Sequence, residues 1–353
     1  MDVCICGESA VELWRTWRLF GVAGLLEMGV RPSEQFAQSW QSCTLAGSTP
    51  FFQPPSSRWV ERFLQPEGIH LSEPVDFIST DGQHRVFSQV IMSHVAHPNL
   101  LAQDFVAINE HVCILTPEAS LMMATRDFDR VEALRLVNEF CGTYVADPGC
   151  PKGFHDAAQL TSRQSLLRFC DQHPTWKRAR DFRRDVGHAV DGCASPAEST
   201  MALLLCLPAK FGGFGLPRPT MNAPICLDSR TNRLADRTHY VGDAVWPDAK
   251  VIVEYDSKAE HTDQASVTHD HIRKMALEAN GYHVGVVTPG ILANADLLEK
   301  VALDTGKRLW HRCRTRLDAA DFAKRQRKAR EVLIDVPNRW HKAWRLTTPG
   351  SRG

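Results

Sequence analysis

The sequence predicts a mixed α/β protein, in which a central mixed sheet flanked by helices forms the C-terminal core and an α+β region precedes it. Two observations carry this prediction. Residues 239–246 and 250–256 read as two strands joined by a short turn, which is typical of a β-hairpin. Residues 264–280 then favour a helix that ends at Gly281, and the Val-rich segment 283–288 favours a buried strand. A strand–helix–strand connection of this length favours parallel pairing.

The N-terminal half contains the α+β elements. Strands are expected at 75–78, 85–91 and 112–115. Thr116 and Pro117 are suited to the N-cap and the first position of a helix, and a second helix is expected at about 128–141.

A chain of 353 residues is long enough for two or three domains. Composition and patterning divide it into an α+β region, a helical connector, the α/β core and a basic helical tail. The expected boundaries are 1–150, 151–194, 195–292 and 293–353.

The composition is that of an ordinary globular protein, with 43% hydrophobic and 23% charged residues. The net charge is zero, so no overall attraction to nucleic acid follows from it. The charge is uneven, however, because residues 307–345 hold 13 Lys and Arg against 4 Asp and Glu. With Trp340 and Trp344 interleaved, this tail is a candidate phosphate-binding surface, and a charged, solvated helical end is the alternative. Residues 324–330 place basic side chains on every side, which argues against an amphipathic membrane helix.

The 11 cysteines are scattered without a Cys-x-x-Cys pair, and no signal peptide is apparent. Both observations favour reduced thiols and a cytoplasmic location. The longest apolar run, Met201–Pro208, is too short to cross a bilayer, so no membrane partner is expected.

The predicted hairpin places two carboxylates opposite each other. If it is symmetric about the Asp248–Ala249 bond, Asp243 faces Glu254, with Cβ atoms about 4.5–5.5 Å apart. Like charges at this spacing are destabilising, and a shared divalent cation is the commonest chemical reason for them. The alternative is an exposed strand face. It is weakened by Val251–Val253, because a carboxylate beside β-branched apolar residues is costly unless it is paired or metal-bound.

Two further carboxylates lie in this region. Glu198 lies three residues after Ser195, which is the spacing of a capping box, and Pro196 suits the first helical position. Capping alone therefore accounts for Glu198. Asp256 lies two residues after Glu254 and hence on the same strand face, as a further ligand or as an ordinary strand-end residue.

The order of these residues resembles the PD-(D/E)xK restriction-endonuclease-like fold, in the branch related to very-short-patch mismatch repair endonucleases. The likeness covers about residues 195–289. The residues that carry it are Asp243, Glu254–Ser257, His261, Asp270, Arg273 and Gly281–Val284. Two positions depart from the wider pattern: Asp256 replaces the lysine of Glu-x-Lys, a change shared with this branch, and Ser257 replaces a glycine.

The resemblance implies a metal-dependent DNA endonuclease that hydrolyses phosphodiester bonds, in phage defence or DNA repair. Asp243 and Glu254 would hold Mg²⁺ or Mn²⁺, and Glu198 would reach the same ion. His261 or Lys258 would do the work of the missing lysine, by positioning the attacking water or protonating the leaving group. Without that lysine, a catalytically inactive DNA-binding regulator or antitoxin-like protein is the alternative.

Residues 75–145 resemble the middle part of abortive-infection antitoxin-like proteins. The shared order is an Arg-rich strand, a strand ending in Ser93-His94, and Thr116-Pro117-Glu118 at a helix start. The resemblance implies that this region contacts DNA or a protein partner. The alternative is a small α+β module with ordinary capping.

Overall fold

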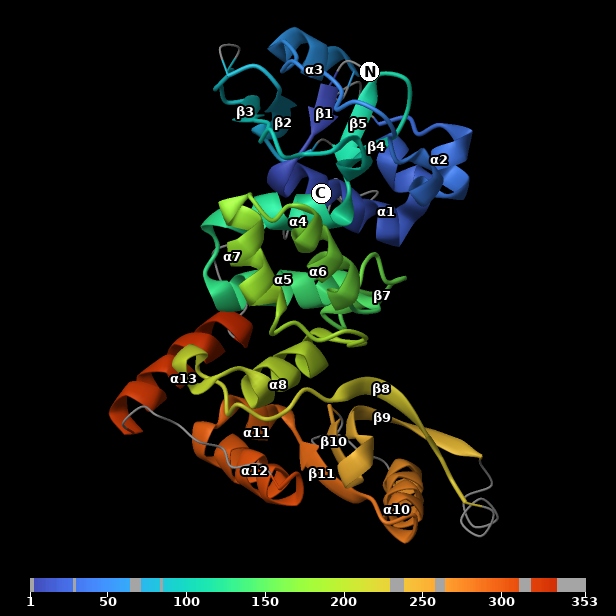
Figure 1. The fold of residues 1–353 in the computed structure, drawn as a ribbon. Helices are drawn as coiled ribbons and strands as arrows, with labels where there is room; N and C mark the ends of the chain where they lie inside the picture. Colours follow the sequence, from blue (N-terminus) through green and yellow to red (C-terminus); the bar gives the residue numbers. More distant parts are fainter. Residues whose placement is uncertain are drawn as a thin grey trace. The chain divides into compact units, whose positions relative to one another are not determined.

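The computed structural model describes residues 3–27, 30–63, 71–82, 85–228, 238–257, 264–310 and 319–334. The chain is a mixed α/β structure, as predicted, and it divides into two compact units (Figure 1). Among the described residues, unit 1 comprises those within Met1–Phe140 and Val145–Gly187, and unit 2 those within Cys141–Tyr144 and His188–Pro337.

Unit 1 is built on a five-stranded mixed sheet in the order β3-β2-β1-β5-β4. β1 is parallel to β5, and β2 is parallel to β3, whereas the other neighbours are antiparallel. The bounds are β1 Val3–Ile5, β2 Val75–Ser79, β3 Ile91–Val95, β4 Phe105–Ala107 and β5 Val112–Leu115. β1, β2 and β5 are buried along their whole length, so they form the centre of the core.

Helices complete unit 1. They are α1 Gly7–Glu27, α2 Glu34–Gln38, α3 Ser57–Phe63, α4 Pro117–Ala124, α5 Arg130–Phe140, α6 Arg163–Gln172 and α7 Lys177–Val186, with a small hairpin of β6 Tyr144–Ala146 and β7 Phe154–Asp156. A fully buried ion pair connects α1 to α5, because Arg15 Nε lies 2.7 Å from Glu139 Oε1. Removing one partner would leave an uncompensated buried charge, so the pair fixes how these helices pack.

Two predictions for unit 1 have opposite outcomes. The capped helix is confirmed, because the Thr116 side chain accepts the Ala119 N–H at the start of α4. The strand predicted at 85–91 is wrong, and the strand that joins the sheet is β3, whose Ser93 lies opposite Phe77. The preceding segment folds back on it, and the Val86 N–H donates to the Ser93 hydroxyl at 2.7 Å.

Unit 2 contains a four-stranded sheet in the order β11-β10-β9-β8. β8, β9 and β10 are antiparallel neighbours, and β11 is parallel to β10, which confirms the predicted parallel connection. The strands are β8 Thr220–Cys226, β9 His239–Trp246, β10 Val251–Tyr255 and β11 His283–Val287. The helices are α8 Pro196–Cys206, α10 Gln264–Ala279, α11 Pro289–Ala293, α12 Ala295–Arg308 and α13 Ala319–Leu333. A core of Ile252, Val245 and Val284 packs against Leu277 of α10.

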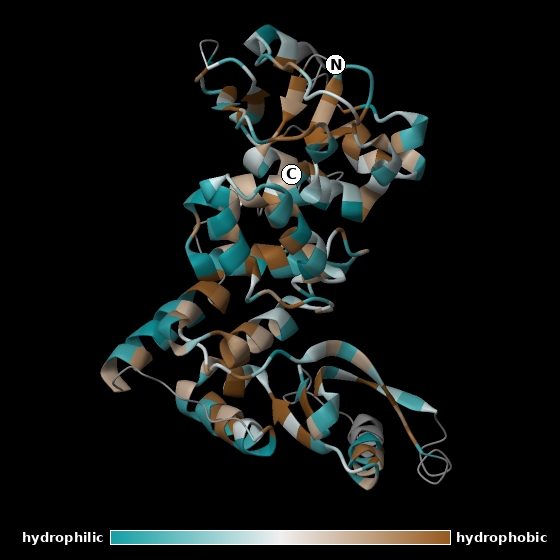
Figure 2. Cartoon of the chain, in the orientation of Figure 1, coloured by the Kyte–Doolittle hydropathy of each residue, from teal (hydrophilic) through white to brown (hydrophobic). Residues whose placement is uncertain are grey.

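The C-terminal helix α13 is part of unit 2. Although it is largely hydrophilic in Figure 2, one stripe of it is buried, namely Phe322, Gln326, Ala329 and Leu333. The expectation of basic residues on every side was therefore wrong, because this helical spacing of about four leaves one face for packing. That face contacts α8 and the segment around Gly212.

None of the described helices combines the length and the apolar character needed to cross a bilayer.

Candidate metal centre

The predicted register of the unit 2 hairpin is confirmed. Trp246 lies opposite Val251, and Ala244 lies opposite Val253. The next position along this register brings Asp243 of β9 beside Glu254 of β10.

At this position the two carboxylates replace the regular backbone ladder. The Asp243 N–H donates to Glu254 Oε2 at 3.3 Å. The Tyr255 N–H donates to Asp243 Oδ2 at 2.7 Å. Each carboxylate thus satisfies a backbone donor of the opposite strand, which holds both side chains at the same place between the strands.

One basic residue reaches the pair from α10. Arg273 Nη2 donates to Glu254 Oε1 at 2.8 Å and to the Val241 carbonyl at 2.5 Å. Arg273 also acts on Asp243 through its charge, but it donates no hydrogen bond to that carboxylate, and no N–H group of the described residues donates to Asp243 Oδ1. The charge of Glu254 is therefore compensated more directly than that of Asp243.

Burial and mutual repulsion disfavour two negative charges here. Burial, and then the neighbouring Glu254 carboxylate, raise the pKa of Asp243 to about 6. Burial also raises the pKa of Glu254, while Arg273 acts in the opposite direction. The pair therefore holds a proton to a higher pH than separate carboxylates would, and a cation placed between them would take the proton's place.

Glu198 is engaged in capping. The Ser195 hydroxyl accepts the Glu198 N–H at 3.1 Å, which confirms the N-cap, and donates to Glu198 Oε1 at 3.0 Å. The other oxygen accepts the Ala194 N–H at 2.8 Å and the Asn222 side-chain N–H at 2.6 Å. The predicted capping box is thus shifted by one residue, because the Glu198 carboxylate accepts the N–H of Ala194, the residue before the N-cap, and not that of Ser195. These bonds commit both oxygens of Glu198.

Asn222 is the residue that sequence reasoning missed. It lies between Met221 and Ala223 of β8, which pair with Ala244 and Gly242, so it occupies the place opposite Asp243. Its φ of 47° interrupts the strand. The only signal in the sequence was an Asn inside a strand, a residue type that tolerates this conformation.

Asn222 extends the polar row. Its amide reaches Glu198 at one end of the row, and Arg273 reaches Glu254 at the other. Burial raises the pKa of Glu198, and the Asp243 carboxylate acts in the same direction, so the two acids lie within electrostatic range of each other. Glu198 therefore lies near the Asp243–Glu254 pair, with Asn222 between them. Among the described residues, no hydrogen bond joins the Glu198 carboxylate to the pair.

The remaining candidates are placed as follows. The Asp256 N–H donates to the Val287 carbonyl at 2.9 Å, and its side chain is half-buried. His261 and Lys258 lie outside the described residues, and so does the side chain of Asp270.

The donor set matches the preferences of Mg²⁺ or Mn²⁺. Two adjacent carboxylates supply hard oxygen ligands, and among the described residues no N–H donor competes for Asp243 Oδ1. Within the described ranges, no cluster of three or more His, Cys, Asp or Glu side chains has metal-binding geometry. Asp243 and Glu254 would therefore hold the ion together with water or substrate oxygens, as is usual for Mg²⁺.

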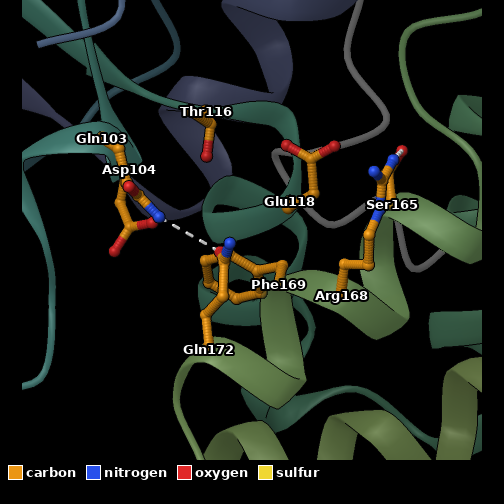
Figure 3. A pocket seen from close by; sticks show the side chains of 8 residues that line it. All are labelled: Gln103, Asp104, Thr116, Glu118, Ser165, Arg168, Phe169 and Gln172. Carbon is orange, nitrogen blue, oxygen red and sulfur yellow. Dashed lines mark hydrogen bonds between the residues drawn. The ribbon is translucent and has the colours of Figure 1, made fainter.

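A small hollow in unit 1 offers no comparable chemistry. It measures about 240 Å³, and Figure 3 shows Gln103 and Gln172 joined across it by a hydrogen bond of 3.2 Å. Glu118, on its wall, accepts a hydrogen bond from the Thr161 hydroxyl. Asp104 accepts the Leu101 N–H at 2.8 Å and lies 3.1 Å from His173 Nε2. Its acids are thus committed to internal partners.

Comparison of the chain with protein-family models, curated proteins and solved structures found no match.

Proposed function

We propose that unit 2 is a metal-dependent endonuclease that hydrolyses phosphodiester bonds in DNA, with Mg²⁺ or Mn²⁺ held by Asp243 and Glu254. The observation that carries the proposal is this pair of half-buried carboxylates on adjacent antiparallel strands. An arrangement that burial and repulsion both oppose is better explained by a ligand than by stability.

The order of elements supports a restriction-endonuclease-like core. The two acids lie on successive strands, Arg273 lies on the following helix, and the Gly281–Val284 segment leads into β11 beside β10. This is the order in which the motifs occur in the branch related to very-short-patch mismatch repair endonucleases.

The chemistry follows from the groups that surround the scissile phosphate. When bound, the metal ion would polarise the phosphate and stabilise the leaving oxygen. Asp243 must lose its proton before it can bind the ion, so activity should rise with pH through about 6. Arg273 keeps Glu254 in place and favours its ionised form, against the effect of burial on the pKa of that carboxyl. His261 or Lys258 would position the attacking water or protonate the leaving group.

The test is cleavage of plasmid and single-stranded DNA by the purified full chain with Mg²⁺, with Mn²⁺ and with a chelator. Asp243→Asn should abolish metal-dependent cleavage, whereas Asp248→Asn, an exposed acid in the turn of the same hairpin, should retain it. Equal cleavage by the wild type and Asp243→Asn would assign the activity to another site or to a contaminant.

A second candidate function is a catalytically inactive nuclease-fold protein that binds DNA as a regulator, in the manner of antitoxin-like proteins. The ion pair between Arg273 and Glu254 favours it, because the guanidinium occupies an oxygen that a cation would use. Asp256, in place of the lysine of the wider pattern, favours it too. DNA binding without cleavage under any of these metal conditions would select this function.

A further inference from the structure

Unit 1 contains a cavity of about 510 Å³, which lies within the size range of small-molecule sites. It is bordered by β3, the start of α1, the end of α4 and the start of α7. Its walls combine basic groups, two stacked rings and exposed apolar side chains. The basic groups are Arg85, His94, Arg126 and Arg178.

Arg178 is a half-buried cation that makes no hydrogen bond to a carboxylate in the described chain. Its Nε donates to the Met122 carbonyl at 3.0 Å, and its Nη2 donates to the Thr125 hydroxyl at 3.0 Å. Burial is the largest influence on its pKa and lowers it. Nη1 makes no hydrogen bond to the described residues. A desolvated guanidinium with a spare donor is suited to an anionic ligand.

His94 is held in place on the same wall. Its Nε2 lies 2.9 Å from Asp76 Oδ1. The other Asp76 oxygen accepts the N–H of Ser9 at 3.1 Å and its hydroxyl at 3.0 Å. Because the Asp76 carboxylate accepts the Nε2 proton, Nδ1 of the neutral ring is an acceptor, and it can take a hydrogen bond from a ligand hydroxyl or amino group.

The acids of the cavity are largely committed to neighbours. Asp127 accepts hydrogen bonds from Nε and Nη2 of Arg126, and Asp76 is engaged as described above. Glu8 lies in the first turn of α1, where the helix dipole stabilises a negative charge. Arg85 is exposed and makes no hydrogen bond or ion pair with the described residues, so its guanidinium is available to a ligand. The available hydrogen-bonding groups are therefore mainly donors.

Aromatic rings and apolar side chains line another part of the cavity. His97 stacks on Trp176 with ring centroids 4.3 Å apart and an interplanar angle of 11°. Burial lowers the pKa of His97, which favours its neutral form. Phe87 and Met92 line the cavity and are 64% and 36% exposed. Large exposed apolar side chains beside a cavity are typical of a ligand-binding surface.

We infer that this cavity binds a nucleotide. Arg178 and Arg85 would bind the phosphate, because each guanidinium has N–H donors that its contacts with the described residues do not use. The base would lie against the apolar side formed by Phe87, Met92 and the His97–Trp176 stack, because flat rings and apolar side chains can pack against the face of any base. This inference concerns unit 1 and does not rest on the nuclease proposal.

The test is isothermal titration of the full chain with AMP, GMP, CMP and UMP, in chelator so that no metal-dependent cleavage takes place. At least one nucleotide should bind about tenfold or more tightly than inorganic phosphate or its own nucleoside, because only a nucleotide uses both sides of the cavity. Arg85→Gln should weaken that binding about tenfold. Arg180→Gln, an exposed arginine of α7 outside the cavity, should leave it unchanged.

Arg178→Gln should weaken binding further, and its thermal unfolding is compared with that of the wild type because this side chain also supports α4. Arg85 makes no hydrogen bond or ion pair with the described residues, so its variant keeps the test valid if Arg178→Gln does not fold. Absence of nucleotide binding at millimolar concentration, equal binding by Arg85→Gln, or inorganic phosphate binding as tightly as nucleotides would each overturn the inference. Asp243→Asn should bind nucleotides like the wild type, which separates this site from the carboxylate pair.

Discussion

Replacing Asp243 with Asn should stabilise the metal-free protein at neutral pH and much less in acid. The pKa of Asp243 is about 6 in the folded chain, above its ordinary value of 3.8. An acid that holds its proton more tightly in the folded state makes folding less favourable as the pH rises from about 4 to 6, and the penalty persists above that range. Asn carries no charge, so it removes the penalty, while its carbonyl can still accept the Tyr255 N–H.

The magnitude follows from the two pKa values. The penalty from ionising Asp243 in the folded chain is about 1 kcal/mol at pH 4.5 and about 3 kcal/mol at pH 7.5. The gain in unfolding free energy of Asp243→Asn over the wild type should therefore grow by about 2 kcal/mol between these pH values. Comparing the two proteins at each pH cancels the titration of most other groups.

The measurement is urea unfolding of the full chain in chelator at pH 4.5 and 7.5, followed through the transition of unit 2. Asp248→Asn is the matched control, because that carboxylate is exposed in the same hairpin, and its effect should not change with pH in this way. Mg²⁺ in excess should raise the unfolding midpoint of the wild type and not that of Asp243→Asn, because an ion that binds only the folded state stabilises it. A lower stability of Asp243→Asn than of the wild type at pH 7.5 in chelator, or an equal effect of the substitution at both pH values, would rule out an ionisation penalty at Asp243.

Two further predictions concern α13 and its contacts. Gly212→Ala should lower the free energy of unfolding by about 2 kcal/mol or more, because φ is +89° and a Cβ would lie 2.5 Å from the Arg325 carbonyl oxygen. Gly215→Ala is the control, since its φ is also positive but its Cβ would meet nothing within 4 Å, and equal losses in thermal or urea unfolding would contradict the contact argument. If α13 binds DNA through phosphates, replacing the exposed Lys324 and Arg327 with Gln should reduce the slope of log affinity against log salt by roughly 1.8 for a duplex. An unchanged slope would place the DNA contact elsewhere.

Local signals predicted the elements that position the candidate site. Ser195 and Thr116 begin their helices as predicted, because a hydroxyl N-cap followed by proline depends on a few adjacent residues. The register that brings Asp243 beside Glu254 also depends on one short turn, so the sequence contains the information that sets it.

What the sequence did not predict depends on partners far along the chain. The guanidinium of Arg273 contacts Glu254, 19 residues away, and Asn222 bonds to Glu198, 24 residues away. The strand expected at 85–91 had suitable residues, yet the sheet pairs the next segment, because pairing is decided by the neighbouring strand and not by propensity alone. Whether Glu198 caps a helix or binds a metal likewise depended on which groups surround it.

The place of α13 has a consequence for the order in which the chain folds during synthesis. The Thr200 hydroxyl of α8 donates to the Leu333 carbonyl at 3.3 Å, across 133 residues of sequence. Until α13 has left the ribosome, α8 lacks the helix that covers it, and apolar residues such as Phe214, which contacts Phe322, stay exposed to water. The segments of unit 1 up to residue 187 are complete much earlier. We therefore expect unit 1 to fold first on the ribosome, and nascent chains that end before residue 319 to present an unfinished, aggregation-prone unit 2.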